Sequence, residues 1–215
     1  MATRKYQQKR RAEQQAETRQ RIVDALVALH REIGPARTTI SAVAERAGVE
    51  RLTVYRHFAD ETAMFQACSA HFATQVVPPD PALWANVEDP SDRLRAALLA
   101  FYDYFRRGED MFVQVQRDAP LLPALVAVLS PWDAFVREVR DRLVEGWVEP
   151  GPGRVRLAAA VAHSLRFETW RSLARVEGLG DVEAADLMVT LAQATVQRES
   201  LSSGAQPASG PPESR

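Results

Sequence analysis

The sequence predicts an all-α protein, in which a three-helix N-terminal head with a helix-turn-helix precedes a C-terminal helical bundle. Three observations support this fold class. Apolar residues recur at intervals of three and four along most of the chain, which is the spacing of amphipathic helices. Residues 38–58 are typical of two short helices that meet at a glycine. Stretches rich in Pro and Gly, at 77–90 and 150–153, separate longer helical segments.

Composition narrows the class of protein further. A chain of 215 residues with 46% hydrophobic and 26% charged residues can bury a core and suits one ordinary domain or two small ones. The single cysteine excludes an internal disulfide and a multi-cysteine metal site. No apolar run approaches the roughly 20 residues of a membrane span. The N-terminus is basic and Gln-rich, unlike a secretory signal, so we expect a cytoplasmic protein.

Charge is distributed unevenly along the chain. The net charge is −1, yet residues 1–75 contain 12 Lys and Arg against 8 Asp and Glu. The basic part is therefore the part with the helix-turn-helix pattern. Such polarity is expected when one end of a protein meets phosphate and the other does not.

The first segment, residues 1–17, lacks apolar periodicity and is expected to be a flexible basic arm. It would contact phosphate or enter a minor groove; a solvated tail is the alternative. The basic residues of this arm are Arg4, Lys5, Lys9, Arg10 and Arg11. A first helix should follow from Thr18 to Ile33 and end at Gly34-Pro35, with one apolar face formed by Ile22, Leu26, Leu29 and Ile33.

Residues 38–58 contain the strongest local signals. Thr39 can cap a helix whose apolar stripe is Ile40, Val43, Ala44 and Ala47, and Gly48 can end it in a left-handed conformation. A second short helix follows from Glu50 to His57, with Leu52 or Val54 facing inward. Its outer side would present Arg51, Thr53, Tyr55, Arg56 and His57. This shape, rich in hydrogen-bond donors, fits a DNA major groove.

These residues resemble the DNA-binding domain of the TetR family of bacterial transcriptional repressors. The resemblance rests on Thr38-Thr39, Val43-Ala44, Ala47-Gly48-Val49 and the run from Thr53 to Phe58, and is strong over about the first third of the chain. It implies that Tyr55 and His57 hold phosphate. We expect Arg51, Thr53 and Arg56 to reach base edges, Leu52 to join this surface, and Thr39 to meet phosphate at a helix N-terminus. The family usually has Lys where this chain has Glu61, which puts a phosphate contact there in doubt.

The remaining chain is predicted to be helical. A helix capped by Asp60 would bury Met64, Phe65, Cys68 and Phe72, with Cys68 a packed residue rather than a nucleophile paired with His71. Further helices are expected from residue 89 or 91 to Gly108, over 109–117, over 121–129, from Ser130-Pro131 onward, and over 154–177 and 181–199. The predicted domains are therefore the arm (1–17), the head (18–76), the ligand-binding and dimerisation body (77–199) and a disordered tail (200–215).

The body offers two sets of candidate residues. The last two helices are apolar on more than one side, which favours a homodimer interface that includes Leu157, Val161, Leu165, Leu187 and Leu191. Aromatic and polar residues could line an effector pocket, although each could instead be an ordinary core residue. These pocket candidates are Phe101, Tyr104, Phe105, Phe112, Gln116, Trp132, Phe135, His163, Phe167 and Trp170.

Together these patterns predict a transcriptional regulator. The simplest form is a repressor that binds a palindromic, inverted-repeat operator as a homodimer and is released by a small, largely apolar ligand. A DNA-binding regulator that answers to a protein, or to no effector, is the alternative. A small helical enzyme is more distant, because the sequence contains no HExxH motif, no phosphate-binding Gly loop and no complete nucleophile–base constellation. We therefore expect no catalytic residues, no metal site and no cofactor.

Overall fold

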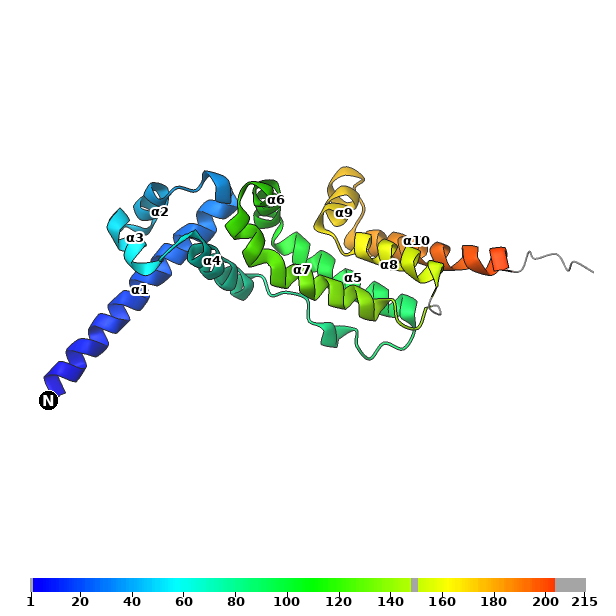
Figure 1. Cartoon of the computed structure of the whole chain (residues 1–215), viewed down its shortest axis with the longest axis horizontal. Coiled ribbons are helices and arrows are strands. Elements are labelled where there is room, and N and C mark those ends of the chain that lie inside the picture. Colours follow the sequence, from blue (N-terminus) through cyan, green and yellow to red (C-terminus); the bar gives the residue numbers. More distant parts are fainter. Residues whose placement is uncertain (1, 148–150, 204–215) are drawn as a thin grey trace, which may run out of the picture. The chain divides into compact units, whose positions relative to one another are not determined.

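Helices and helical turns form every regular element of residues 2–147 and 151–203, the parts of the chain that this computed structural model describes. The all-α prediction is confirmed. The α-helices are α1 (Ala2–Glu32), α2 (Ile40–Ala47), α3 (Arg51–His57), α4 (Glu61–Gln75), α5 (Pro90–Arg107), α6 (Glu109–Asp118), α7 (Pro123–Leu143), α8 (Pro152–Ser164), α9 (Phe167–Arg171) and α10 (Asp181–Ser203) (Figure 1).

Two compact units, each made of two separate chain segments, contain these helices. The head unit combines residues up to Pro78 with residues Tyr104–Asp133, and the body unit combines Pro79–Asp103 with the chain from Ala134 onward. Helices α5 and α7 each contribute residues to both units. The segment 104–133, which the sequence assigned to the body, therefore packs with the head.

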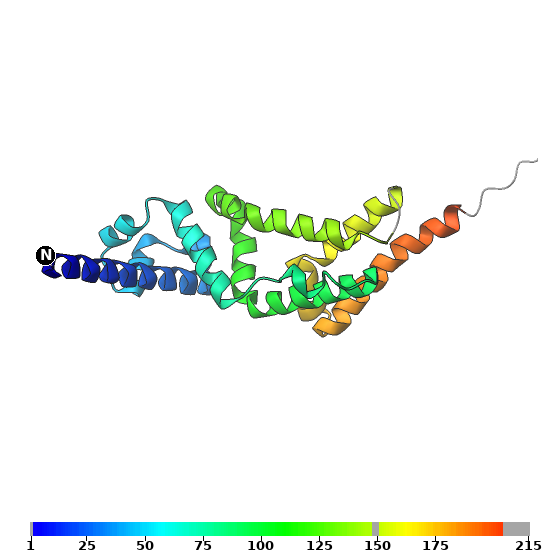
Figure 2. The same ribbon diagram turned by 90° about the horizontal axis from the view of Figure 1, so that it is seen from below.

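Helix α1 corrects the expectation of a flexible arm. It is one unbroken helix from Ala2, and its first half extends past α2 and α3 (Figures 1 and 2). Residues 6–17 are exposed. Gln, Arg, Lys, Glu and Ala are good helix formers, and this segment contains no Gly or Pro. The segment therefore lacks apolar periodicity because it packs against no other element, although it is helical.

The core of the head unit forms where the second half of α1 packs against α2, α4 and α6. Ile22 and Val54 are fully buried, and Val43 is 1% exposed. Burial of each such side chain contributes roughly 1.5–3 kcal/mol. Phe58, Phe65, Cys68 and Phe72 complete this layer, so the prediction that Cys68 is a packed core residue is confirmed.

Helix α7 corrects the prediction that a new helix opens at Ser130-Pro131. The helix runs without a break from Pro123 to Leu143, with Pro131 inside it. Proline has no N–H to donate to the carbonyl four residues earlier, which here belongs to Ala127. The Ser130 hydroxyl donates to that carbonyl at 2.9 Å, so the group that proline leaves unpaired is satisfied.

The predicted single helix over 154–177 is also wrong. The first helix of this region, α8, begins at Pro152, inside the expected 150–153 loop. Pro150 of that loop lies outside the described residues. Helix α8 ends at Ser164, Arg166 is extended, and α9 leads into a π-helical turn, Ser172–Val176. The Tyr102 hydroxyl donates to the Ser164 carbonyl at 3.1 Å and the Thr169 hydroxyl to the His163 carbonyl at 2.6 Å. Side chains from elsewhere thus satisfy the carbonyls at the break.

The body unit is built around α8 and α10, which pack against each other. The last helix continues to Ser203, four residues into the predicted tail, and residues 204–215 of that tail lie outside the described part of the chain. Within the described ranges, no helix combines the length and the apolar character needed to cross a bilayer.

Candidate nucleic-acid interface

The turn between α2 and α3 has the geometry that the sequence predicted. The Thr39 hydroxyl accepts from the Ala42 N–H at 3.1 Å and caps α2. Gly48 has φ 64° and ψ 42°, a left-handed conformation that glycine adopts without steric cost. The Val49 N–H then donates to the Ala44 carbonyl at 2.9 Å. The chain therefore turns sharply into α3.

Helix α3 has one buried and one exposed side. Val54 is fully buried, and Leu52 is 59% exposed, so Val54 is the residue that faces inward. Tyr55 is 54% exposed. The outer surface consists of exposed Arg51, Leu52, Tyr55 and Arg56, with half-buried Thr53 and His57. It combines guanidinium and hydroxyl donors with an apolar side chain that could meet a thymine methyl group.

Contacts between helices hold α2 and α3 in place on α1. The Arg46 guanidinium donates to both carboxylate oxygens of Glu32, at 2.8 and 2.7 Å, and this hydrogen bonding lowers the pKa of the Glu32 carboxyl. The Arg21 guanidinium donates to the Ala47 carbonyl at the end of α2. The Arg19 guanidinium lies 4.6 Å from the centre of the Phe58 ring. These contacts fix the position of α2 and α3 on α1, and with it the position of the outer surface of α3.

Two further predicted positions flank this surface. Thr39 is exposed at the N-terminus of α2. Glu61 is exposed in the first turn of α4, where the Asp60 carboxylate accepts from the Ala63 N–H at 2.8 Å. Because Glu61 stands at the surface with its negative charge, it would repel a nearby phosphate.

The basic residues of the N-terminal segment lie along α1. Lys9 forms an ion pair with Glu13 at 3.8 Å, and Arg10 lies 6.0 Å from the Tyr6 ring centre. Arg11 is exposed. The side chains of Arg4 and Lys5 lie outside the described part of the chain.

A buried His–Cys pair links α1 and α4 beneath the surface. His30 Nδ1 lies 3.2 Å from Cys68 Sγ, and the two residues are 3% and 4% exposed. Burial lowers the pKa of His30 to about 4, against an opposing effect of the Asp118 charge, and raises the pKa of the Cys68 thiol to about 12. The pair is therefore neutral near pH 7, and the thiol is not a nucleophile. His30, not His71, is the partner of Cys68.

The pocket candidates are divided between the two units. In the head unit, Tyr104 lies between Phe112 and Trp132, at ring-centre distances of 4.9 and 5.3 Å. Phe105 meets Phe112 edge-on at 5.8 Å. Phe112 and Trp132 are half-buried, and Gln116 is exposed. This part of the set is an aromatic cluster with accessible surface.

The other five candidates belong to the body unit. Phe101 is fully buried and stacks on Phe135 at 6.3 Å, and Phe167 packs on Trp170 at 5.6 Å. The Trp170 indole N–H donates to the Asp181 carboxylate at 2.9 Å. His163 is exposed and is therefore not a core residue.

The dimer-interface candidates also divide by burial. Leu157 and Val161 are fully buried and Leu165 is 2% exposed within a single chain, because they lie in the core beside α10. Leu187 and Leu191 are 39% and 49% exposed. Of the five candidates, only Leu187 and Leu191 therefore have substantial exposed apolar surface.

One set of contacts was missed by the sequence reasoning. Gln114, Arg117 and Asp118 of α6 bond to residues 31–36, on either side of the α1 terminus. Beside them, an open pocket of about 520 Å³ is lined by Arg31, Arg106, Arg107, Glu109, Asp110, Val113 and Gln114, none of them a pocket candidate. No local pattern marks such contacts, because Ala36 and Asp118 are 82 positions apart.

The fold and this surface define a helix-turn-helix protein. Residues 22–68 match the sequence profile of the family described as bacterial regulatory proteins, tetR family. The resemblance to the TetR family is thereby confirmed over this segment, which contains α2 and α3. No curated protein matches the sequence.

Several solved structures share the fold at low sequence identity. A TetR-like transcriptional regulator from Rhodococcus sp. RHA1 is 21% identical, with TM-score 0.60 over 81% of this chain and 93% of its own. A candidate TetR-family regulator from Syntrophomonas wolfei is 16% identical, with TM-score 0.61 over 85% and 96%. A second Rhodococcus transcriptional regulator is 20% identical, with TM-score 0.57 over 84% and 96%. The chain thus has the fold of TetR-family transcriptional regulators along most of its length.

Proposed function

We propose that this protein is a DNA-binding transcriptional regulator, and that it represses by occupying an inverted-repeat operator as a homodimer. The observation that supports this most directly is the exposed, donor-rich side of α3, on a helix whose opposite side is anchored by buried Val54. A helix held in this way can enter a major groove without rearrangement. We place the protein in the cytoplasm, where operators are accessible, and assign it no catalytic role.

The side chains of α3 divide into two roles. Arg51, Thr53 and Arg56 read base edges, because a guanidinium can pair with guanine through two hydrogen bonds. Leu52 contacts thymine methyl groups. Tyr55, His57 and Thr39 hold phosphates and set the register of the helix on the duplex.

A homodimer would form through α8 and α10. Leu187 and Leu191 leave an exposed apolar stripe on α10, which a second copy of the same helix can cover. Leu157, Val161 and Leu165 would support the interface from within, by fixing α8 against α10. Two heads on one two-fold axis would explain a preference for palindromic DNA.

The N-terminal half of α1 would contact DNA beside the main site through one face. Arg11 lies on the helical face that continues, through Gln15 and Arg19, to the buried Ile22. Lys9 lies on a different face and pairs with Glu13. Arg11→Ala should therefore weaken DNA binding and reduce its salt dependence, whereas Lys9→Ala serves as the matched control. Equal effects of the two substitutions would contradict the assignment of this face.

The repressor would be released by a small, largely apolar ligand. The half-buried Phe112 and Trp132 support this, because they leave aromatic surface accessible beside Tyr104. The ligand must bind one conformation more tightly than the other in order to shift the equilibrium. A regulator without a ligand remains the alternative, and compounds that raise the melting temperature without releasing DNA would favour it.

Selection of bound sequences from a random pool of duplex DNA tests the main proposal. We expect an enriched palindrome with half-sites about one helical turn apart or somewhat more. Arg51→Ala should change the preferred bases, whereas Tyr55→Phe should weaken binding to all sequences alike. No enrichment, or a uniform loss of affinity in both variants, would overturn the proposed function or the division of roles respectively.

A further inference from the structure

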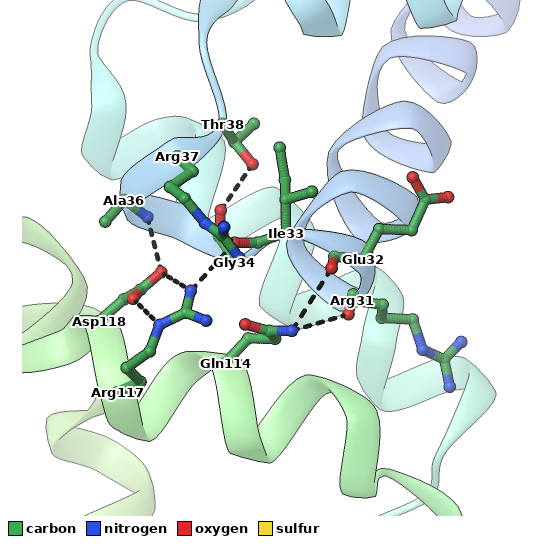
Figure 3. Close-up of polar contacts among 10 residues, drawn as sticks. All are labelled: Arg31, Glu32, Ile33, Gly34, Ala36, Arg37, Thr38, Gln114, Arg117 and Asp118. Atoms are coloured by element: carbon green, nitrogen blue, oxygen red, sulfur yellow. Dashed lines mark hydrogen bonds and ion pairs between the residues drawn. The ribbon is translucent and has the colours of Figure 1, made fainter.

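The connection between α1 and α2 is held by side chains that come from α6 (Figure 3). The Asp118 carboxylate accepts from the Ala36 N–H at 2.9 Å, and the residue is 2% exposed. Asp118 also receives two hydrogen bonds from the Arg117 guanidinium, at 2.7 and 3.0 Å. The hydrogen bonds from Arg117, and then the one from the Ala36 N–H, lower the pKa of the Asp118 carboxyl.

The same helix satisfies carbonyls at the end of α1. The Arg117 guanidinium donates to the Ile33 carbonyl at 3.0 Å, and the Gln114 amide approaches the Arg31 and Glu32 carbonyls at 3.4 and 3.5 Å. The last carbonyls of a helix have no partners within it. Cations are favoured at this end, where the helix dipole is negative. Helix α6 therefore completes the C-terminus of α1.

Gly34 leaves no room for a side chain. Gly34 has φ 90°, and a Cβ at this position would overlap both the Arg117 guanidinium and the Asp118 carboxylate. The Thr38 hydroxyl donates to the Gly34 carbonyl at 2.9 Å. The turn is consequently fixed on both sides, by its own bonds and by α6.

The connection leads directly into the helix-turn-helix. Ala36 lies three residues before Thr39, the residue that caps α2 and that we propose to hold phosphate. A displacement of Asp118 would therefore be passed through a short, tightly bonded turn to the start of α2. All of these residues belong to the head unit, so the contacts are internal to one compact body.

We propose that Asp118 is a positioning residue for DNA binding, through which α6 sets the place of α2 on the duplex. The inference rests on the proposed function, because it assumes that α2 and α3 contact DNA. Asp118 itself does not touch DNA. It acts by holding the Ala36 N–H, with Arg117 and Gln114 holding the end of α1.

The test combines Asp118→Ala with two further substitutions and a matched control. Asp118→Ala should weaken operator binding about tenfold or more, because it removes the charge-assisted hydrogen bond to the Ala36 N–H as well as the two from Arg117. Asp118→Asn keeps an acceptor oxygen for Ala36 but sets its amide N–H against the Arg117 Nε–H donor, so it should restore only part of the affinity. The control is Asp141→Ala, because Asp141 also accepts two hydrogen bonds from the preceding Arg but is exposed and belongs to the body unit.

Amide hydrogen exchange distinguishes a local loss of the Ala36 hydrogen bond from a general loss of stability of the head unit. In Asp118→Ala the Ala36 amide should exchange at least about tenfold faster, since the bond that protects it is gone, while amides around Val54 keep their protection. Uniformly faster exchange throughout the head, or unchanged affinity in a folded Asp118→Ala protein, would overturn the proposal.

Two complications are separable in this design. If Asp118→Ala does not fold, Asp118→Glu keeps the charge but moves it by one methylene; reduced affinity would then support positioning, and wild-type affinity would refute it. If no DNA is bound at all, the proposed function fails, yet local exchange at Ala36 still decides whether Asp118 holds the turn.

Discussion

Acid should destabilise the protein through His30, and the size of this effect follows from the structure. The ring is 3% exposed, with Cys68 Sγ at 3.2 Å and the Phe65 ring centre at 5.8 Å. Burial lowers the pKa of His30 from 6.5 to about 4 in the folded state. An unfolded chain would instead titrate His30 near the ordinary value of about 6.5. Protons therefore bind the unfolded state first as the pH falls.

The sign and size follow from proton linkage. Stability from neutral His30 is fully present above pH 6.5 and is lost as the pH falls towards 4. Each pH unit in that window should remove up to about 1.4 kcal/mol from the free energy of unfolding, with a total of about 3 kcal/mol. Below pH 4 the folded state also binds the proton, and the loss from this group stops.

Urea denaturation at several pH values between 7 and 4.5 would measure the effect. The protein concentration is kept constant, because the proposed homodimer would unfold in a concentration-dependent way. Carboxylates titrate in the same range, so the comparison must be made with His30→Leu, which keeps every carboxylate but has no titratable group at position 30. As the pH falls from 6.5 towards 4, we expect the free energy of unfolding of the wild type to decrease relative to that of His30→Leu, by up to about 3 kcal/mol in total. Parallel curves for wild type and His30→Leu would refute the reasoning.

Three further predictions concern single sites. Gly34→Ala should lower the free energy of unfolding by more than about 1 kcal/mol, measured by urea denaturation, because it places a side chain at positive φ against Arg117. Pro131→Ala should raise it by about 1–3 kcal/mol in the same assay, since alanine restores a helix N–H; a decrease would show that proline has a packing role. The Cys68 thiol should resist iodoacetamide at pH 8 and react on unfolding, as its pKa of about 12 keeps it protonated; rapid labelling of the folded protein would contradict its burial.

Local signals predicted the helix-turn-helix because each of them acts within a few residues. A capping Thr39 and a left-handed Gly48 determine backbone geometry through bonds to near neighbours, so their effect can be inferred from sequence. Spacing alone offered Leu52 or Val54 as the inward-facing residue, and the structure shows that Val54 is the buried one.

Some errors arose where one local pattern fits two structures, and others where distant groups decide the outcome. Pro131 has the sequence signature of a helix start, but Ser130 compensates for it within a continuous helix. Nothing in residues 154–177 signals a helix break, since the hydroxyl of Tyr102 that stabilises it lies 62 positions away. Aromatic composition alone could not assign Phe101 and Phe112 to different units.

The discontinuous head has a practical consequence for protein engineering. A fragment that ends at Pro78 would retain every residue of the helix-turn-helix, yet it would expose the Ala36 amide and the ring of Phe72, which meets Phe112 at 5.7 Å. A chimeric regulator made by exchanging only the N-terminal segment would likewise lose the contacts of Ala36 and Phe72 with α6. A transferred fragment should therefore also include residues 104–133, because these complete the compact head unit.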